Sequence, residues 1–319
     1  IVNINASPFH AGKRDQREKM IATRATDNEL FVAYLNAVGG QDELVFDGAS
    51  VIYDSGGKLM TRGTAFNEEL IITDLDIESV LRTRLRDPRP RKENTTILKE
   101  IGTSKKVHVS PQEVQSHSPL SAQPPADPIG EVEEVYRALV LGTHDYLTKS
   151  GFSKVLIGLS GGVDSALTAV VAADALGHKN VVGVAMPSRY SSEGSINDAK
   201  ELADTLGIEL WVVPIEPAHT AFADMLEDRF RDTEVNTAEE NVQARIRGNI
   251  LMTISNKFGW MVLTTGNKSE LATGYSTIYG DMAGGFAVIK DVPKTMVYKL
   301  AEYRNELNSQ PTIPLRVLT

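Results

Sequence analysis

The residues Ser160-Gly-Gly-Val-Asp-Ser165 have the types and spacing of a turn that binds phosphate. Its two adjacent glycines let an anion approach the backbone without a Cβ in the way, and its serine hydroxyls add hydrogen-bond donors. The carboxylate of Asp164 would repel phosphate unless a Mg²⁺ ion lies between the two groups. The pattern therefore predicts a magnesium–phosphate site. The alternative is a helix start capped by serines, without a ligand.

The segments on either side of this turn have the patterns needed to position it. Val155–Leu159 is a short apolar run, typical of a buried strand. From Val163 the apolar residues recur at helical spacing as far as Gly177, a helix stop. The first N–H groups of a helix lack partners within it, and the helix dipole adds positive charge there. A strand, a glycine-rich turn and a helix in this order bind phosphate.

The rest of this half of the chain alternates strands and helices. Apolar runs predict further strands at residues 181–186, 209–215 and 260–265, and helical spacing predicts helices at 129–150, 195–206, 220–230 and 238–258. Such alternation indicates a doubly wound parallel sheet, the α/β class. Ligands of these sheets bind at the carboxyl ends of the strands. Polar residues follow each strand there, at 187–190, 214–216 and 265–270, and Glu270 supplies a second carboxylate for Mg²⁺.

The phosphate turn resembles the pyrophosphate loop of the N-type ATP pyrophosphatases, and the resemblance extends to NAD synthetases over residues 130–305. It rests on the segments Met186–Gly194, Glu240–Asn249, Thr264–Tyr275, Gly280-Asp281 and Lys290–Thr295. The resemblance implies an adenine nucleotide alpha hydrolase-like fold. It also implies that ATP adenylates the nicotinate carboxylate of deamido-NAD, after which ammonia displaces AMP to form NAD.

The same resemblance implies roles for individual residues. Mg²⁺ would be held by Asp164 and Glu270, and Arg245 matches a contact to deamido-NAD. ATP, the co-substrate, would be bound by Gly158, Leu159, Ser160, Gly161, Gly162, Val163, Asp164, Ser165, Thr265 and Lys294. No catalytic nucleophile is expected, because the reaction needs only two reactants held in line. The alternatives are structural: Arg245 and Arg247 as exposed helix charges paired with Glu239 or Glu240, and Lys294 as a surface lysine after a turn.

The first part of the chain has a β-rich pattern. We expect strands at residues 1–5, 30–35, 43–46, 50–53, 58–64 and 69–73, an amphipathic helix at 13–26 and a turn at 36–40. The segments 4–8, 39–43, 46–48 and 54–57 resemble the C-terminal half of the glutaminase domain of glutamine-dependent NAD synthetases. This implies part of an α-β-β-α nitrilase-like domain, in which Ser7 and Lys13 match positions that bind glutamine. For Gly39-Gly40 and Asp47-Gly48 we favour plain turn chemistry.

The catalytic triad of that domain, a Glu, a Lys and a Cys, has no match here, and the 319 residues include no cysteine. The chain as given is expected to use free ammonia, which glutamine would supply in the complete enzyme. Because it begins in mid-strand without a methionine, we expect a fragment. The family also has a further segment beyond Thr319 that reaches ATP and deamido-NAD, so the site is expected to be incomplete.

Three parts are expected: a nitrilase-like domain at residues 1–103, a linker at 104–128 rich in Ser and Pro, and a synthetase domain at 129–319. The basic run 82–92 is interpreted as a solvated connector, because it contains no aromatic residues to stack on bases. His108 and His117 lie too far apart for a metal pair. The glycine-rich segment 281–285 is expected to be a mobile loop over the substrate.

Composition limits the remaining possibilities. The formal net charge of −9 argues against nucleic acid as a partner, and the absence of cysteine excludes disulfides and thiolate metal sites. The chain contains neither an apolar run long enough for a membrane helix nor a signal peptide, so we expect a cytoplasmic protein with small-molecule substrates and no membrane partner. The resemblance implies a homo-oligomer. Alternatives are a GMP synthetase or tRNA-modifying ligase, a non-catalytic adenine-nucleotide-binding module, and a stand-alone amidase.

Overall fold

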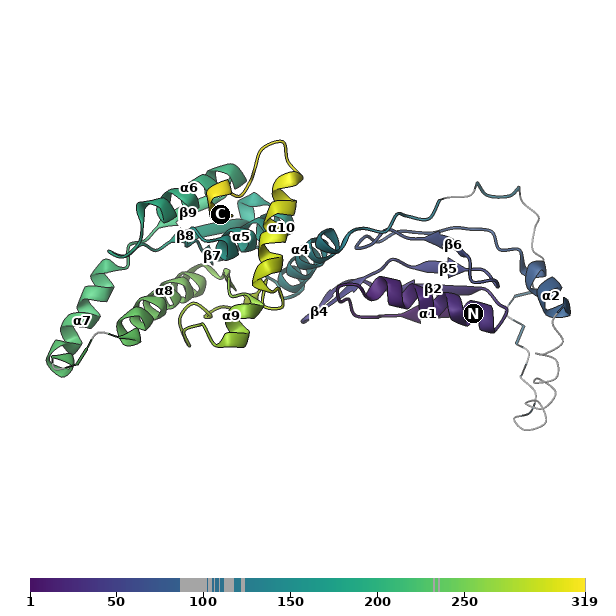
Figure 1. Cartoon of the computed structure of the whole chain (residues 1–319), viewed down its shortest axis with the longest axis horizontal. Coiled ribbons are helices and arrows are strands. Elements are labelled where there is room, and N and C mark those ends of the chain that lie inside the picture. The colour runs from purple at the N-terminus through teal and green to yellow at the C-terminus, as the bar shows by residue number, and fades with distance from the viewer. Residues whose placement is uncertain are drawn as a thin grey trace. The chain divides into compact units, whose positions relative to one another are not determined.

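The computed structural model describes residues 1–86, 102, 105, 107–108, 110–111, 118–121, 124–231, 233–234 and 236–318. The chain divides into two compact units (Figure 1). The first comprises Ile1–Val38 and Phe46–Ile129, and the second comprises Gly39–Val45 and Gly130–Thr319. No helix in the described part of the chain has the length and apolar character needed to cross a membrane.

The first unit is built on a four-stranded sheet in the order β1-β2-β5-β6 among its described residues. Strands β1 and β2 are parallel, and the other neighbours are antiparallel. The 15-residue helix α1 buries Ile21 and Ala25 against apolar side chains of β2 and β5. The bounds are β1 Val2–Asn5, α1 Lys13–Asp27, β2 Val32–Asn36, β5 Val51–Tyr53, β6 Leu59–Arg62 and α2 Ile77–Arg86.

Two expectations for the secondary structure of this part of the chain are wrong. Gly39-Gly40, expected in a turn, lie in β3 (Val38–Gln41), which pairs with β4 (Leu44–Asp47). These glycines are needed for close packing, because a Cβ at Gly39 would lie 2.8 Å from a carboxylate oxygen of Asp145 on helix α4 (Glu131–Lys149). Residues 69–73 form no strand.

The basic run differs from the expected connector in one respect. Residues 82–86, expected in a solvated connector, form the end of α2, and residues 87–92 lie outside the described residues. Arg82 pairs with Asp76, just before the helix, and with Glu78 in its first turn, and all three side chains are more than half exposed, so this part is solvated as expected but helical. Much of the expected linker, including His117, is also outside the described residues.

The second unit contains a parallel five-stranded sheet in the order β11-β10-β7-β8-β9, as far as the structure describes it. The chain runs outward from β7 through β8 to β9 and then returns to β10 on the other side of β7. The point where the order reverses therefore lies between β7 and β10, and open α/β sheets bind ligands there. The bounds are β7 Val155–Gly158, β8 Val181–Ala185, β9 Glu209–Val212, β10 Met261–Thr264 and β11 Phe286–Ala287.

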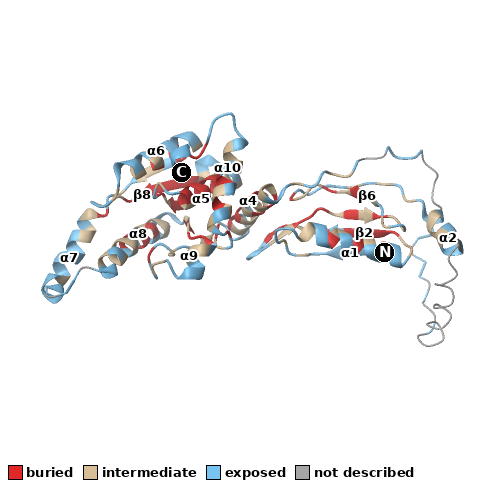
Figure 2. Ribbon diagram, viewed as in Figure 1, coloured by how far each residue is buried: buried red, intermediate tan, exposed pale blue. Residues whose placement is uncertain are grey.

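Both faces of this sheet are covered, as strands with near-continuous apolar sequences require. Successive residues of β7 point to opposite faces. Val155 and Ile157 pack in the core that holds α4, α5 and α10, whereas Leu156 packs with Ile246 and Leu251 of α8. Figure 2 shows the buried residues concentrated along this sheet and α5. The predicted doubly wound α/β fold is confirmed.

The helices of the second unit follow the predicted pattern with additions. Gly177 ends α5 and Gly207 ends α6, as expected. The sequence did not lead us to expect α9, α10 or β11, and α7 begins four residues earlier than expected, at Glu216. The remaining bounds are α5 Val163–Leu176, α6 Glu193–Leu206, α7 Glu216–Phe230, α8 Thr237–Phe258, α9 Lys268–Thr273 and α10 Lys294–Glu306, with short 3-10 turns at His178–Asn180 and Leu315–Val317.

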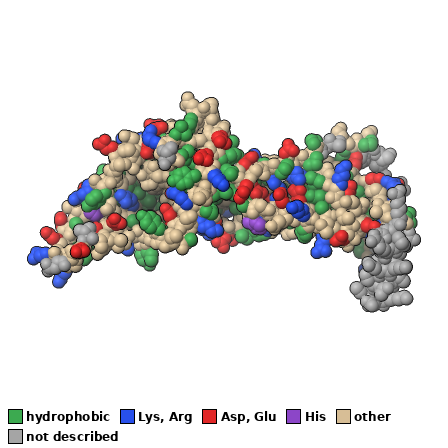
Figure 3. Space-filling view, viewed as in Figure 1, with side chains coloured by type: hydrophobic (Ala, Val, Ile, Leu, Met, Phe, Trp, Pro, Cys, Tyr) green, Lys and Arg blue, Asp and Glu red, His purple; other side chains and the backbone are tan. Residues whose placement is uncertain are grey.

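Charged side chains are mixed by sign on the surface in view. Figure 3 shows Lys and Arg interspersed with Asp and Glu over both units, with no single-sign patch on that face.

Candidate functional site

The phosphate turn is held by its own serines. The Ser165 hydroxyl, buried, donates to the Gly162 carbonyl at 2.9 Å and lies 3.1 Å from the Ser160 hydroxyl, which in turn accepts from the Gly162 N–H at 3.2 Å. Helix α5 has no side-chain cap at Gly162. The serines thus brace the turn, and the N–H groups at the start of α5 remain available to an anion.

Gly161 allows this turn to lie against α6. Its φ is +81°, and a Cβ there would lie 2.5 Å from the Ser195 carbonyl oxygen. A glycine is therefore required twice over, by the left-handed backbone and by the close approach of a second chain segment.

Asp164, in the first turn of α5, contacts two other segments. One carboxylate oxygen accepts a hydrogen bond from the Asn267 side chain at 3.0 Å, and the other forms an ion pair with the ammonium group of Lys294. Lys294 is the first residue of α10, 130 positions along the chain. The structure therefore brings together two residues that the sequence analysis assigned to ATP.

Glu270 reaches the same asparagine from α9. The Asn267 N–H donates to the Glu270 carboxylate at 3.0 Å, and the Asn267 side-chain oxygen accepts from the N–H groups of Ser269 and Glu270. This is a capping box, and Asn267 is fully buried. Asn267 thus links Asp164 to Glu270. Asn267 was not among the predicted site residues, although Asn followed three residues later by Glu is a helix-start signal.

The two carboxylates fit the needs of Mg²⁺. Both line one cavity, and Mg²⁺ in nucleotide sites takes one or two carboxylates and completes its shell with phosphate oxygens and water. No group of three or more His, Cys, Asp or Glu that could hold a metal occurs among the described residues. The donors present therefore suit an ion that arrives with a phosphate ligand rather than one held by the protein alone.

The cavity lies at the carboxyl ends of β7, β8 and β10 and has a volume of about 400 Å³, within the range of small-molecule sites. Of the residues assigned to ATP or Mg²⁺, it is lined by Gly158, Leu159, Ser160, Asp164, Ser165, Thr265 and Glu270. Gly161, Gly162, Val163, Lys294 and Arg245 are not among the lining residues. Segment 281–285, expected to be a mobile loop, contributes Asp281, Met282 and Ala283 to the wall; its mobility stays a prediction.

Thr264, at the end of β10, is a second residue that the sequence analysis missed. Its hydroxyl is buried without a hydrogen-bond partner among the described residues, and the residue lines the cavity. A buried hydroxyl without a partner costs free energy, so a polar ligand in the cavity would be favoured there. At this strand end, the sequence-based assignment to ATP was made for its neighbour Thr265 instead.

The two arginines of α8 differ in position. Arg245 is exposed, and its Nε donates to the Ile278 carbonyl at 3.3 Å. Arg247 is half-buried, lines the cavity and donates from Nε to the Met186 carbonyl at 3.1 Å. Arg245 is thus an exposed helix charge, as the structural alternative has it, but the expected pairing is wrong: no ion pair joins either arginine to Glu239 or Glu240 in the described part of the chain, and Glu239 instead caps the start of α8.

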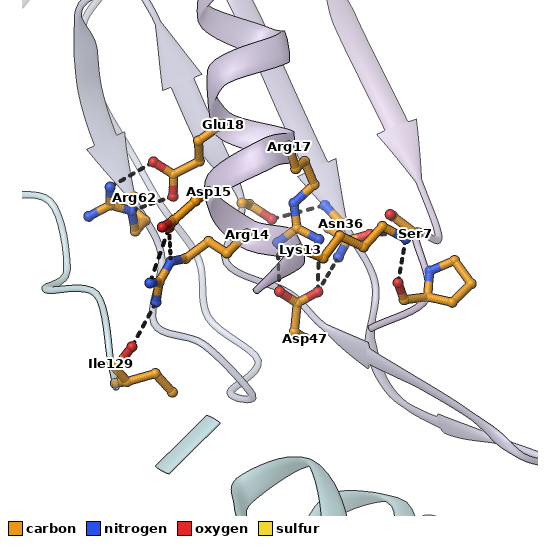
Figure 4. Close-up of polar contacts among 12 residues, drawn as sticks. Ser7, Lys13, Arg14, Asp15, Arg17, Glu18, Asn36, Asp47, Arg62 and Ile129 are labelled. Carbon is orange, nitrogen blue, oxygen red and sulfur yellow. Dashed lines mark hydrogen bonds and ion pairs between the residues drawn. The ribbon is translucent and has the colours of Figure 1, made fainter. Parts of the chain in front are cut away.

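In the first unit, Ser7 lies on the connection between β1 and α1, and Lys13 is the first residue of α1. The Lys13 ammonium donates to the Pro8 carbonyl at 2.5 Å, and the Ser7 N–H donates to the Asn36 side chain at 2.8 Å (Figure 4). The backbone is therefore held at Ser7, and the side chain is held at Lys13.

Behind Ser7, a buried polar network fixes Asn36. The Asn36 amide donates to Asp47 at 3.0 Å, and Arg17 makes two hydrogen bonds to the same carboxylate at 2.9 and 2.6 Å (Figure 4). Burial works against the charge of Arg17, but Asp47 outweighs it and raises the pKa of the guanidinium. The interpretation of Asp47 as plain turn chemistry is therefore wrong.

Two protein families match the chain. The family described as NAD synthase matches residues 135–319, and the family described as carbon-nitrogen hydrolase matches residues 1–85. The glutamine-dependent NAD(+) synthetase of Thermotoga maritima is 49% identical over 316 residues, which is 98% of this chain and 54% of that protein. The chain thus spans about half the length of this relative.

Solved structures of NAD synthetases are also similar to the chain. The glutamine-dependent NAD+ synthetase from Acinetobacter baumannii, in complex with ADP, matches 100% of this chain and 53% of its own, with a TM-score of 0.82 and 40% identity. An NH3-dependent NAD synthetase from Campylobacter jejuni matches 59% of this chain and 77% of its own, with a TM-score of 0.53 and 30% identity.

Proposed function

The chain belongs to the NAD synthase family, and we propose that its α/β unit catalyses the ATP-dependent amidation of deamido-NAD to NAD. ATP is cleaved to AMP and pyrophosphate, and ammonia supplies the nitrogen. The observation that carries this proposal is the pair of carboxylates, Asp164 and Glu270, bound to one buried asparagine on the wall of a cavity at the point where the strand order reverses.

The reaction needs two displacements. A nicotinate carboxylate oxygen attacks the α-phosphorus of ATP and pyrophosphate leaves; ammonia then attacks the acyl carbon, loses a proton, and AMP leaves. The chain's part is to bind phosphate through the N–H groups at the start of α5 and to place Lys294 beside the site. Asp164 and Glu270 would hold Mg²⁺, which when bound supplies positive charge to the phosphate oxygens.

The remaining assignments are part of the proposal. Gly158–Ser165, Thr265 and Lys294 bind ATP, and Arg245 binds deamido-NAD from the exposed side of α8. Ser7 and Lys13 bind glutamine in a nitrilase-like domain at residues 1–103, which a linker at 104–128 joins to the synthetase domain at 129–319. The similarity to the glutamine-dependent synthetase of T. maritima supports this division.

We also propose a cytoplasmic homo-oligomer without nucleic-acid or membrane partners. The mixed surface charge in Figure 3 and the net charge of −9 support the absence of a nucleic-acid partner. An apolar groove in the second unit, lined by Trp211, Val213, Phe222, Ile250 and Ile254, supports self-association.

The test is an assay of the chain with Mg-ATP, ammonium and deamido-NAD. We expect NAD, AMP and pyrophosphate in equal amounts. Xanthosine monophosphate in place of deamido-NAD should give no product, which separates the proposal from a GMP synthetase. ATP binding without any turnover would favour the non-catalytic module instead, and phosphate in place of pyrophosphate as the product would contradict the proposed cleavage.

A further inference from the structure

Arg247 is the one cationic side chain among the described residues that line the nucleotide cavity. The charged residues that share this wall are Asp164, Glu270 and Asp281, which are all acidic. Asp164 forms an ion pair with Lys294. The ammonium group of Lys294, which was assigned to ATP, is therefore already paired with a carboxylate. A ligand that carries several negative charges would therefore meet one uncommitted positive side chain here, that of Arg247.

Arg247 is fixed in position by its neighbours. Its Nε donates to the Met186 carbonyl at 3.1 Å, directly after the end of β8. The phosphate turn is tied to this strand, because the Leu159 N–H donates to the Val184 carbonyl at 2.9 Å. The next residue of α8, Gly248, packs so closely that a Cβ there would lie 2.7 Å from the Gly280 carbonyl oxygen. The guanidinium thus lies beside the strand that borders the phosphate turn.

The charge of Arg247 lacks a counter-ion within the described chain. No described carboxylate forms an ion pair with it, in contrast to the half-buried Arg62 and Arg304, which pair with Glu18 and Asp174. Burial lowers the pKa of the Arg247 guanidinium. An arginine stays protonated nonetheless, and a cation removed from water without a partner is costly. A bound anion would remove that cost.

We propose that Arg247 binds a phosphate group of ATP through the guanidinium nitrogens that Met186 leaves free. A guanidinium presents planar, paired donors that match phosphate oxygens, and Nε is already used to hold the group in place. This inference rests on the proposed nucleotide site. The competing role is purely structural: Arg247 would only brace the Met186 carbonyl and thus the end of β8.

The test compares ATP with adenosine, because adenosine lacks the phosphates that Arg247 would bind. In the full chain, Arg247→Gln removes the charge but keeps a side-chain donor for the Met186 carbonyl. We expect its dissociation constant for Mg-ATP, measured by calorimetry, to rise at least about tenfold, the effect of losing a charged hydrogen bond. The dissociation constant for adenosine should change by less than about twofold. Arg247→Lys, which keeps the charge without the fork, should fall between the two proteins.

The matched control is Arg229→Gln, on the exposed surface of α7, which should bind both ligands as the unmodified chain does. Equal losses for ATP and adenosine, or unchanged ATP binding, would overturn the inference in favour of a structural role. Thermal unfolding shows whether each variant is folded. If Arg247→Gln does not fold, the binding of ATP and of adenosine is compared in Arg247→Lys instead. This test measures binding and does not depend on turnover. If the unmodified chain made no NAD but Arg247→Gln selectively weakened ATP binding, the proposed function would be refuted and the inference about Arg247 would stand.

Discussion

Asp164 is held by two partners of different kinds, an amide at Asn267 and an ammonium at Lys294. Asp164→Asn would keep the size and polarity of the side chain but remove the charge that pairs with Lys294 and that Mg²⁺ requires. We expect NAD formation to fall at least about a hundredfold, as when a charge-stabilising group is lost from an active site. The measurement is kcat as a function of Mg²⁺ concentration, with ammonia as the nitrogen source.

Asp228→Asn is the control for this prediction. Asp228 forms an exposed ion pair with Arg231 on the surface, and such pairs contribute little, so its turnover should match that of the unmodified chain. An Asp164→Asn enzyme with normal turnover and normal Mg²⁺ dependence would show that this carboxylate does not serve a metal.

A second prediction at the scale of single residues concerns the buried ion pair of Arg17 and Asp47. Both side chains are only 4% exposed, and the Arg17 Nε already lacks a partner among the described residues. Asp47→Ala would leave a buried guanidinium without a counter-ion, which costs about 3–5 kcal/mol. Exchange of the backbone amide hydrogens of the first unit, followed at increasing urea concentration, measures this loss. Asp15→Ala, which removes a carboxylate that is 69% exposed in its pair with Arg14, should cost less than about 1 kcal/mol; an equal effect would contradict the argument.

Single residues were predictable where local pattern sufficed. The types and spacing in Ser160–Ser165 indicated phosphate chemistry, and the structure places Asp164 and Glu270 on one cavity wall. Asn267 and the Arg17–Asp47 pair were not predictable in the same way. Asn267 and Asp164 are 103 positions apart in the sequence, and Arg17 and Asp47 are 30 apart. Contacts between residues so far apart depend on the packing of the fold rather than on any local pattern.

At the scale of elements, the phosphate turn depends on Gly161 for its path between β7 and α5. Gly161→Ala would place a Cβ against the Ser195 backbone in addition to the strain of a φ of +81°. The backbone strain alone costs about 1–2 kcal/mol. The overlap with Ser195 forces the turn to move, so we expect Mg-ATP binding by calorimetry to weaken by more than about tenfold, since the N–H groups would no longer converge on one phosphate.

Gly151→Ala is a matched control, because Gly151 has the same φ of +81° and nothing lies within 4 Å of the added Cβ. This variant should lose stability through backbone strain but keep its affinity for ATP. If the two variants bound ATP equally well, the close approach to Ser195 would have no role in the site.

Elements with strong periodicity were predictable, and short or closely packed ones were not. Strand β8 follows from a continuous apolar run and helix α5 from apolar residues at helical spacing, whereas α9 has six residues and β11 two, which is too few for a period to appear. Gly39 and Gly40 misled the analysis for a related reason. Their sequence is typical of a turn, but they lie in β3, where Asp145 of α4 packs close to both of them. Tertiary packing decided the outcome there.

At the scale of the whole chain, the two units carry different parts of the proposed chemistry. The described residues of the second unit hold the cavity and the carboxylates, whereas those of the first unit hold Ser7, Lys13 and the buried network behind them. The order of β-rich segments followed by alternating strands and helices made this two-part organisation predictable, because each pattern builds its own sheet.

The nitrogen source is the prediction that belongs to this scale. A glutaminase of the nitrilase type needs a thiol nucleophile, and the 319 residues include no cysteine. With Mg-ATP and deamido-NAD, we therefore expect ammonium to support NAD formation and glutamine to give only the rate of its contaminating ammonia. Adding a separate glutaminase to the glutamine reaction should restore the ammonium rate, because the α/β unit needs ammonia and not its precursor. Glutamine-driven synthesis by this chain alone, with no ammonia released to solution, would mean that another side chain of the first unit attacks the amide.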